Sequence, residues 1–432
     1  MRTNRYLFLL LMLGFLGCDS SSSIEDPNES FFVKFYGDDG DQTGNDLVAM
    51  PDGTFILFGT SRLSPDPNDP KRRTDSQWYL VKTDAKGYTL WTKTFGSLFD
   101  EEASDIELTN DGRLVAVGNT YRSPSDRDIL IMTLTLDGIK IDSTVVGNLH
   151  ILPTDEAAAS VTQTNDGFII AGSSSDTDIK PNAVAGDQRD ALHYRVNNNL
   201  TPYLSSWGNA TGPGTYDASV KVIQVSTSQY YVFGYSNKVA PGHLNPDYNY
   251  WVIGLGSTGV PNFNDLFIGL NDDEKLGSII LAPSPNDGYY LGGITNNSAG
   301  TSDIYVSKVR TPMSFQSTDI QFQKPLSIQI GSNVPEKTSV FPSMPGGFLL
   351  LANENAVNGN QNWILTKINI DGSILWTLPI VFGGEGLDTC GSVQELPDGH
   401  LVIIGTMQTI KPDAGETKMT LIKVNGEGKL LN

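Results

Sequence analysis

"LWTKTFGSLFDEEASDIELTNDGRLVAVGNT", residues 90–120, contains two apolar runs that each end at a glycine, with an acidic stretch and an Asn-Asp-Gly turn between them. Asn or Asp followed by Gly between apolar runs predicts a β-hairpin, because glycine adopts positive φ without steric cost. If the stretch recurs along the chain, it is the unit from which the fold is built.

The second of these runs occurs seven times along the chain. The copies are TFILFGT (54–60), RLVAVGN (113–119), FIIAGSS (168–174), YYVFGYS (230–236), YYLGGIT (289–295), FLLLANE (348–354) and LVIIGTM (401–407). Their closing residues lie about 53 to 62 residues apart, and most copies follow a Gly-containing turn. Self-similarity at such a period is typical of repeat architectures, including propellers.

Each unit also contains a third strand, such as QWYLVKTDAKG (77–87), and an outer strand that ends in glycine, such as LWTKTFG (90–96). Seven units of four antiparallel strands predict an all-β fold, a seven-bladed β-propeller. The consecutive apolar residues Phe55 to Phe58 support this fold, since a strand covered on both faces shows such a run.

The segment FFVKFYG (31–37) matches the outer-strand element, whereas the last unit has only three full strands. We therefore expect the N-terminal strand to complete the last blade, which removes an open sheet edge. The predicted propeller covers residues 31–432.

The N-terminal segment MRTNRYLFLLLMLGFLGCDSSSS, residues 1–23, has two arginines before an apolar run of about 11 residues from Tyr6 to Leu16. A membrane-spanning helix needs roughly 20 residues, so the run predicts a signal peptide. Gly17-Cys18 resembles the lipobox of bacterial lipoproteins, which implies removal of residues 1–17 and a lipid, including palmitate, on Cys18. The alternative is an ordinary signal peptide with an incidental cysteine. Residues 18–30 are acidic and Ser-rich and predict a solvated tether.

The repeat elements quoted above resemble the β-propeller repeats of secreted and lipid-anchored proteins of the Bacteroidetes. The acidic, Ser-rich stretch after Cys18 also resembles the surface-export signal of lipoproteins from that group. Together these resemblances imply an extracytoplasmic protein, anchored by lipid to the outer membrane and exposed at the cell surface. They imply no particular activity.

Composition and motifs exclude several functions. The formal net charge of -20 argues against a nucleic-acid partner, which would need a basic surface. The four histidines lie in separate elements without metal-ligand spacing, and no nucleophile elbow is present, so no catalytic residue is predicted. No cofactor is predicted except a candidate calcium ion, because Asp38, Asp39 and Asp41 resemble a calcium loop in composition. The alternative is a solvated polar loop.

The long connections follow the second and fourth strands of each unit. Because successive strands are antiparallel, these connections emerge on one face, where we expect ligands to bind. That face carries an acidic set consisting of Glu101, Glu102, Glu156, Asp217, Asp273, Glu274, Glu336 and Asp388. Two interpretations are open: the carboxylates accept backbone hydrogen bonds at the strand starts, or they form a negative rim that attracts a cation or a basic partner.

The favoured functional prediction is a surface-anchored, non-enzymatic module that binds or scaffolds a protein or glycan partner. Two alternatives are compatible with the fold. One is an extracytoplasmic propeller enzyme, such as a hydrolase, a lyase or a quinoprotein-like dehydrogenase, with its site at the axis. The other is a structural subunit of an envelope assembly.

Overall fold

The computed structural model describes residues 30–69, 71–123, 126–146, 155–175, 189–203, 216–243, 246–262, 264–282, 288–332, 334–343, 346–355, 359–409 and 415–430. The predicted signal peptide, Cys18 and nearly all of the tether lie outside these ranges. Within them, no helix has the length and apolar character needed to cross a membrane.

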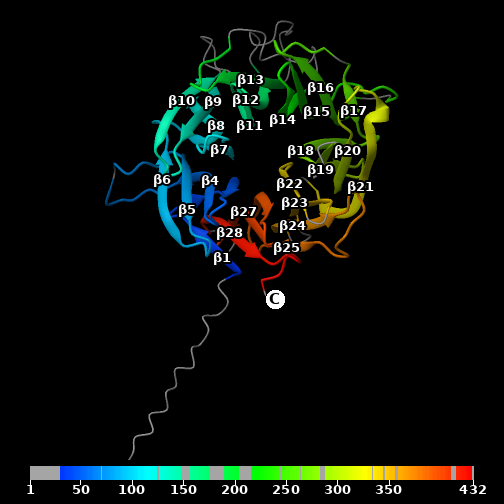
Figure 1. The fold of residues 1–432 in the computed structure, drawn as a ribbon. Helices are drawn as coiled ribbons and strands as arrows, with labels where there is room; N and C mark the ends of the chain where they lie inside the picture. The colour runs from blue at the N-terminus through cyan, green and yellow to red at the C-terminus, as the bar shows by residue number, and fades with distance from the viewer. Residues whose placement is uncertain are drawn as a thin grey trace, which may run out of the picture.

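Seven antiparallel sheets surround a central axis (Figure 1), which confirms the predicted seven-bladed β-propeller. In blades 1 to 6 the strands follow chain order from the axis outward. In blades 1 to 3 these are β2 (Asp41–Gln42), β3 (Asp46–Ala49), β4 (Phe55–Arg62), β5 (Gln77–Thr83) and β6 (Thr89–Phe95); β7 (Glu101–Leu108), β8 (Leu114–Ser123), β9 (Asp126–Leu134) and β10 (Lys140–Val146); and β11 (Glu156–Thr164), β12 (Gly167–Ser174) and β13 (Asp190–Asn197). The outer strand predicted for blade 3 lies outside the described residues.

Blades 4 to 7 repeat this arrangement. Their strands are β14 (Asp217–Ser226), β15 (Gln229–Ser236), β16 (Asn249–Gly256) and β17 (Leu266–Ile268); β18 (Asp273–Leu281), β19 (Tyr289–Asn296), β20 (Ser302–Val309) and β21 (Ile320–Gly331); β22 (Thr338–Pro342), β23 (Phe348–Asn355), β24 (Gln361–Ile368) and β25 (Ile380–Phe382); and β26 (Thr389–Glu395), β27 (Leu401–Gln408), β28 (Thr417–Val424) and β1 (Phe32–Tyr36). A 3₁₀ helix, η1 (Ser317–Asp319), precedes β21.

The ring closes through the N-terminal strand, as predicted. β1 pairs with β28 in antiparallel register from Phe32↔Lys423 to Tyr36↔Met419, and so becomes the outer strand of blade 7. The buried Tyr36 hydroxyl donates a hydrogen bond of 2.8 Å to the carbonyl of Gly87 in blade 1. Closure therefore joins the two ends of the chain by a sheet ladder and by a contact with the neighbouring blade.

The hydrophobic core lies between the blades. Between blades 1 and 2, for example, buried Phe58 and Trp78 pack in one cluster with Leu114 and Met132. The rings of Phe58 and Trp78 meet edge to face, with centroids 5.2 Å apart. Because both faces of each blade are covered, the middle strands bury consecutive apolar residues, and each large buried side chain contributes about 1.5 to 3 kcal/mol.

Steric crowding explains why a glycine ends the apolar run in most copies of the repeat. A Cβ atom on Gly118 would lie 2.1 Å from the carbonyl oxygen of Glu102 on the innermost strand of its blade, and one on Gly172 would lie 2.0 Å from that of Ala157. At these points the inner strand shifts register by one residue, as a β-bulge does. Blade 6 has Ala352 instead, and its inner pairing shows no register shift. The glycine is thus required by the bulge.

Candidate functional site

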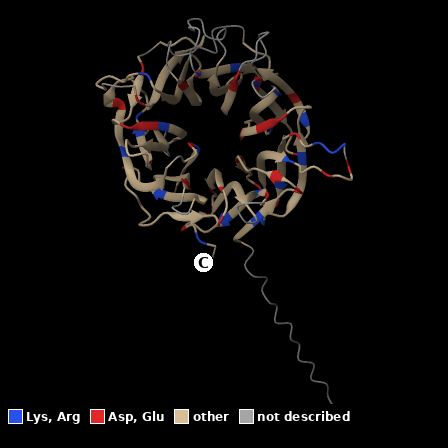
Figure 2. Cartoon of the chain, turned by 180° about the vertical axis from the view of Figure 1, so that it is seen from behind, with Lys and Arg blue, Asp and Glu red and all other residues tan. Residues whose placement is uncertain are grey.

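A cavity of about 440 Å3 lies on the propeller axis, and residues from all seven blades line it. Small residues on the inner strands leave this space open, including Gly277, Gly391 and the three alanines at 157–159. A second cavity of about 520 Å3 shares Asn45 and Lys337 with the first and extends towards the long-loop face. Figure 2 shows acidic and basic segments on strands that lie near the centre of the ring.

Each innermost strand contributes one residue to the lining of this cavity at an equivalent backbone position. In each blade this residue directly precedes an apolar core residue of the same strand. We call these seven residues the inner ring: Asp46, Asp105, Ser160, Lys221, Ser278, Ser339 and Ser392. Three blades therefore carry charge at a position where four blades carry a serine.

Each of the two carboxylates of the inner ring accepts a hydrogen bond from the backbone of the next blade. Asp46 accepts a hydrogen bond of 3.0 Å from the backbone N–H of Ile106, and Asp105 accepts one of 2.8 Å from that of Val161. These bonds tie blade 1 to blade 2 and blade 2 to blade 3.

Serine side chains accept the equivalent inter-blade hydrogen bonds on the other side of the ring. Ser278 accepts a hydrogen bond of 3.2 Å from the N–H of Val340, and Ser339 accepts one of 3.2 Å from that of Val393. Since a hydroxyl is sufficient here and a carboxylate costs more to remove from water, the fold does not require charge at this position. The charged members of the inner ring are therefore the candidate functional residues.

The side chains of Asp46 and Asp105 are hydrogen-bonded to each other. Removal from water and the neighbouring charge of Asp105 together raise the pKa of Asp46 to about 8. Asp46 therefore retains its proton at neutral pH. A protonated carboxyl group beside a second carboxyl group is an arrangement suited to proton transfer.

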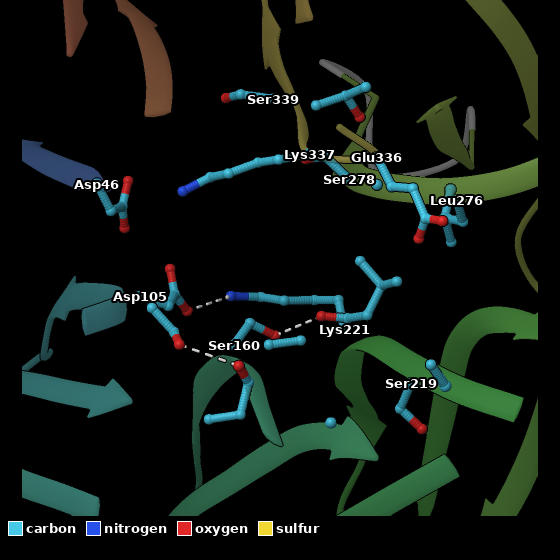
Figure 3. A pocket seen from close by; sticks show the side chains of 18 of the residues that line it. Asp46, Asp105, Ser160, Ser219, Lys221, Leu276, Ser278, Glu336, Lys337 and Ser339 are labelled. Carbon is cyan, nitrogen blue, oxygen red and sulfur yellow. Dashed lines mark hydrogen bonds and ion pairs between the residues drawn. The ribbon is translucent and has the colours of Figure 1, made fainter. Parts of the chain in front are cut away.

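Lys221, on β14, contacts this pair through Asp105. Its Nζ donates to Glu107 at 2.5 Å, to the carbonyl of Val161 at 2.8 Å and to Asp105 at 3.4 Å, the last contact being drawn in Figure 3. Removal from water opposes its charge, but the two carboxylates outweigh this and raise the pKa of Lys221. Burial raises the pKa of Glu107. The lysine and its two carboxylates form a partly buried ionic cluster.

Lys337 directly precedes β22, the innermost strand of blade 6, and lines the axial cavity. Its ammonium donates a hydrogen bond of 2.8 Å to the carbonyl of Asn45, and Figure 3 shows its side chain extended across the cavity towards Asp46. Removal from water lowers the pKa of Lys337. Among the residues that the structure describes, no carboxylate forms an ion pair with it.

Aromatic rings lie beside the cavity at blades 4 and 5. Tyr235 lines the cavity, and its hydroxyl donates to Glu336 at 3.4 Å, while Lys275 binds the same carboxylate at 2.5 Å. The ring of Tyr248 meets that of Tyr235 edge to face at 5.8 Å, and the Lys275 ammonium lies 4.3 Å from the centroid of the Tyr248 ring. One wall of the site is therefore aromatic and charged at once.

The acidic set predicted on the long-loop face does not form a continuous exposed rim. Five of its members are buried at or beside the starts of inner strands: Glu101, Glu156, Asp217, Glu274 and Asp388. Glu101 accepts a hydrogen bond of 2.8 Å from the N–H of Ser97, and Asp388 accepts one of 2.9 Å from that of Gly384. This geometry supports the first interpretation, in which the carboxylates cap the connection between blades.

The other three members of the acidic set are more accessible. Asp273 is partly buried and accepts a hydrogen bond of 2.9 Å from the N–H of Tyr248. Glu102 is exposed and lines the cavity at the long-loop face, and Glu336 lines the axial cavity. Two of the eight predicted residues thus reach a cavity, and a binding role for the set stays a prediction.

The aspartates of the predicted calcium loop have separate protein partners. Asp39 pairs with Arg72 at 2.9 Å, and Asp41 accepts a hydrogen bond of 2.9 Å from the N–H of Thr417. The backbone carbonyl of Asp38 accepts one from Lys418. No group of three or more His, Cys, Asp or Glu residues suited to a metal ion occurs in the described ranges. Bound calcium stays a prediction.

Sequence reasoning missed the inner ring and Lys337. The signal was present, because aligning the seven innermost strands on their apolar core residue produces the column Asp, Asp, Ser, Lys, Ser, Ser, Ser. Without the bulge geometry, nothing indicated that this column faces the axis.

No protein-family model matches the chain, and no curated protein matches it. Several solved structures share its fold. A polysaccharide lyase of family PL25, an ulvan lyase, is 9% identical with a TM-score of 0.51, and the match covers 92% of this chain and 96% of that one. The NanB sialidase from Streptococcus pneumoniae is 10% identical with a TM-score of 0.41, over 92% and 70% of the two chains. An α-L-arabinanase from Penicillium chrysogenum is 10% identical with a TM-score of 0.43, over 75% and 92%. At these identities the likeness concerns the fold alone.

Proposed function

We propose that this protein is a surface-anchored propeller that binds a sugar unit of a glycan in its axial cavity. One observation carries the proposal: the inner ring bears charge where serine would satisfy the fold, around an open space of about 440 Å3. That volume lies within the range of ordinary small-molecule sites, which combine a few placed polar groups with aromatic surface.

The charges around the cavity balance. Asp46, Asp105, Glu336, Lys221 and Lys337 line the cavity, and Glu107 and Lys275 are paired with two of them. Acidic and basic side chains are thus present in similar numbers. A site that is nearly neutral yet rich in donors and acceptors suits a ligand with many hydroxyl groups, and the ring of Tyr235 offers an apolar edge for a sugar face.

The binding experiment uses the full chain with Cys18→Ser, which leaves the protein without its predicted anchor. A glycan array identifies bound sugars, and calorimetry measures their affinities. Ala159 is exposed and lines the cavity, so Ala159→Tyr should fill the space and weaken sugar binding at least tenfold while leaving the thermal midpoint nearly unchanged. Ala299→Tyr, on an exposed loop outside both cavities, is the matched control. Absence of any sugar ligand, or full affinity in Ala159→Tyr, would refute the axial site.

The anchor forms a separate part of the proposal. Growth with a fatty-acid analogue should label the full chain, and Cys18→Ser should abolish the label. Labelling of intact cells with an impermeant reagent then tests whether the propeller faces the outside. A labelled Cys18→Ser protein would contradict the lipoprotein assignment.

A second candidate is a glycan-cleaving enzyme, and the proton-sharing pair of Asp46 and Asp105 is the observation that favours it. Incubating each bound glycan with the protein and measuring new reducing ends separates the two functions. A binding module leaves the glycan intact.

A further inference from the structure

The three lysines at the axial cavity are not equivalent. Lys221 is neutralised by two carboxylates, and Lys275 is neutralised by Glu336 at 2.5 Å. Lys337 donates to a single backbone carbonyl at 2.8 Å. An ammonium group has three donors, so Lys337 can present hydrogen-bond capacity and charge to the cavity.

Lys337 is in register with Glu102 of blade 2 and Lys275 of blade 5, because the inner strand of blade 6 lacks the bulge. Glu102 is exposed and Lys275 is paired with Glu336, whereas no ion pair to Lys337 occurs in the part of the chain that the structure describes. Removal from water lowers the pKa of Lys337, and the nearby carboxyl groups of Asp46 and Asp105 offset this only in part. A bound anion would stabilise the charged lysine further.

Asp46 faces Lys337 across the cavity. Figure 3 shows the end of the Lys337 side chain directed towards Asp46, with open space beside them. The two oxygens of Asp46 accept hydrogen bonds from the N–H groups of Leu47 and Ile106, and burial raises the pKa of Asp46, so this carboxyl group places little negative charge beside the lysine. The remaining N–H groups of Lys337 are therefore the donors that a ligand group can reach.

We infer that Lys337 forms an anion subsite in the axial cavity, and that the sugar bound there carries a carboxylate, as a uronic acid does. This rests on the proposed function, because it names the class of sugar which that site takes. The ligand carboxylate accepts a hydrogen bond from the Lys337 ammonium. A neutral sugar does not gain this charge-assisted bond.

The test compares matched methyl glycosides: glucuronide with glucoside, and galacturonide with galactoside. Wild-type protein should prefer the acidic member at least tenfold. Lys337→Met, which keeps the length of the side chain, should reduce that preference to about twofold while still binding the neutral sugar. Lys337→Arg should retain the preference because it retains the charge. Lys93→Met, on the exposed outer strand β6, is the control.

The outcomes separate this inference from the proposed function. If neutral sugars bind in the cavity with no preference for their uronic partners, the subsite is refuted and the sugar-binding function stands. If no glycoside binds, the proposed function itself fails. A 6-sulfated glucoside that binds better than the glucuronide would overturn the carboxylate assignment. If Lys337→Met does not fold, Lys337→Gln and the salt dependence of wild-type glucuronide binding provide the same comparison.

Discussion

The inner ring has a charged side and a serine side. Asp46, Asp105 and Lys221 lie in blades 1, 2 and 4, whereas Ser278, Ser339 and Ser392 occupy the same backbone position in blades 5 to 7. The aspartates and two of the serines make the same bond, from a backbone N–H of the next blade to a side-chain oxygen. The comparison shows that a hydroxyl group makes the same inter-blade bond as a carboxylate at these four positions, so the bond itself does not require a charge.

The largest effect is expected on the charged side, from removal of its cation. Lys221→Met leaves the carboxylates of Asp105 and Glu107 without their counter-ion. Breaking a buried pair typically costs 3 to 5 kcal/mol, and about 3 kcal/mol is expected here because the cavity admits water. Chemical denaturation measures the loss. A change below about 1 kcal/mol would mean that the cluster is solvated and that the two sides differ little in energy.

Converting the charged side into the serine side tests the comparison directly. The double variant Asp46→Ser and Asp105→Ser keeps a short acceptor at both positions and leaves Glu107, at 2.5 Å, as the counter-ion of Lys221, so the free energy of unfolding should change by no more than about 1 kcal/mol. Sugar affinity should fall at least tenfold, because the ligand loses charge-assisted hydrogen bonds. If the protein unfolds and binding cannot be measured, the claim that serine satisfies the fold is wrong.

The raised pKa of Asp46 predicts a pH dependence that the serine side cannot show. The folded state holds this proton to about pH 8, whereas the ordinary pKa is 3.8. Between these values unfolding releases the proton, so this group's contribution to stability declines as pH rises and is fully lost above about pH 8. Asp46→Asn removes that penalty, so its thermal midpoint relative to wild type should rise by a few degrees between pH 4 and pH 9. A constant difference would contradict the assigned proton.

The smallest effect is expected on the serine side. Ser339→Ala removes the acceptor for the N–H of Val393 and should cost about 1 kcal/mol, independent of both pH and salt. Denaturation at low and high ionic strength measures this. If the loss of stability depended on salt, the charges across the cavity would also contribute to stability on the serine side.

Much of the repeat was readable from local chemistry. The turn before each second strand, the closing glycine and the consecutive apolar residues all act within a few residues of sequence, so they predicted seven blades. The polar residue after the closing position, which is glycine in blades 1, 2 and 7 and Ala352 in blade 6, also has a local signature and a fixed role. Thr60, Asn119, Asn353 and Thr406 each accept a hydrogen bond from an N–H of the next blade.

The candidate site was not readable in the same way. Glu101 and Glu102 are neighbours in the sequence, yet one is buried at a strand start and the other is exposed at a cavity. Asp46, Asp105, Lys221 and Lys337 are far apart in sequence and converge only because four blades meet at one axis. The sequence by itself determined the blades, their number and their closure, since hairpin and strand signals are short-range. Only the tertiary structure decided which charges face one another, because that depends on which inner strands contain a bulge and on the closure of the ring.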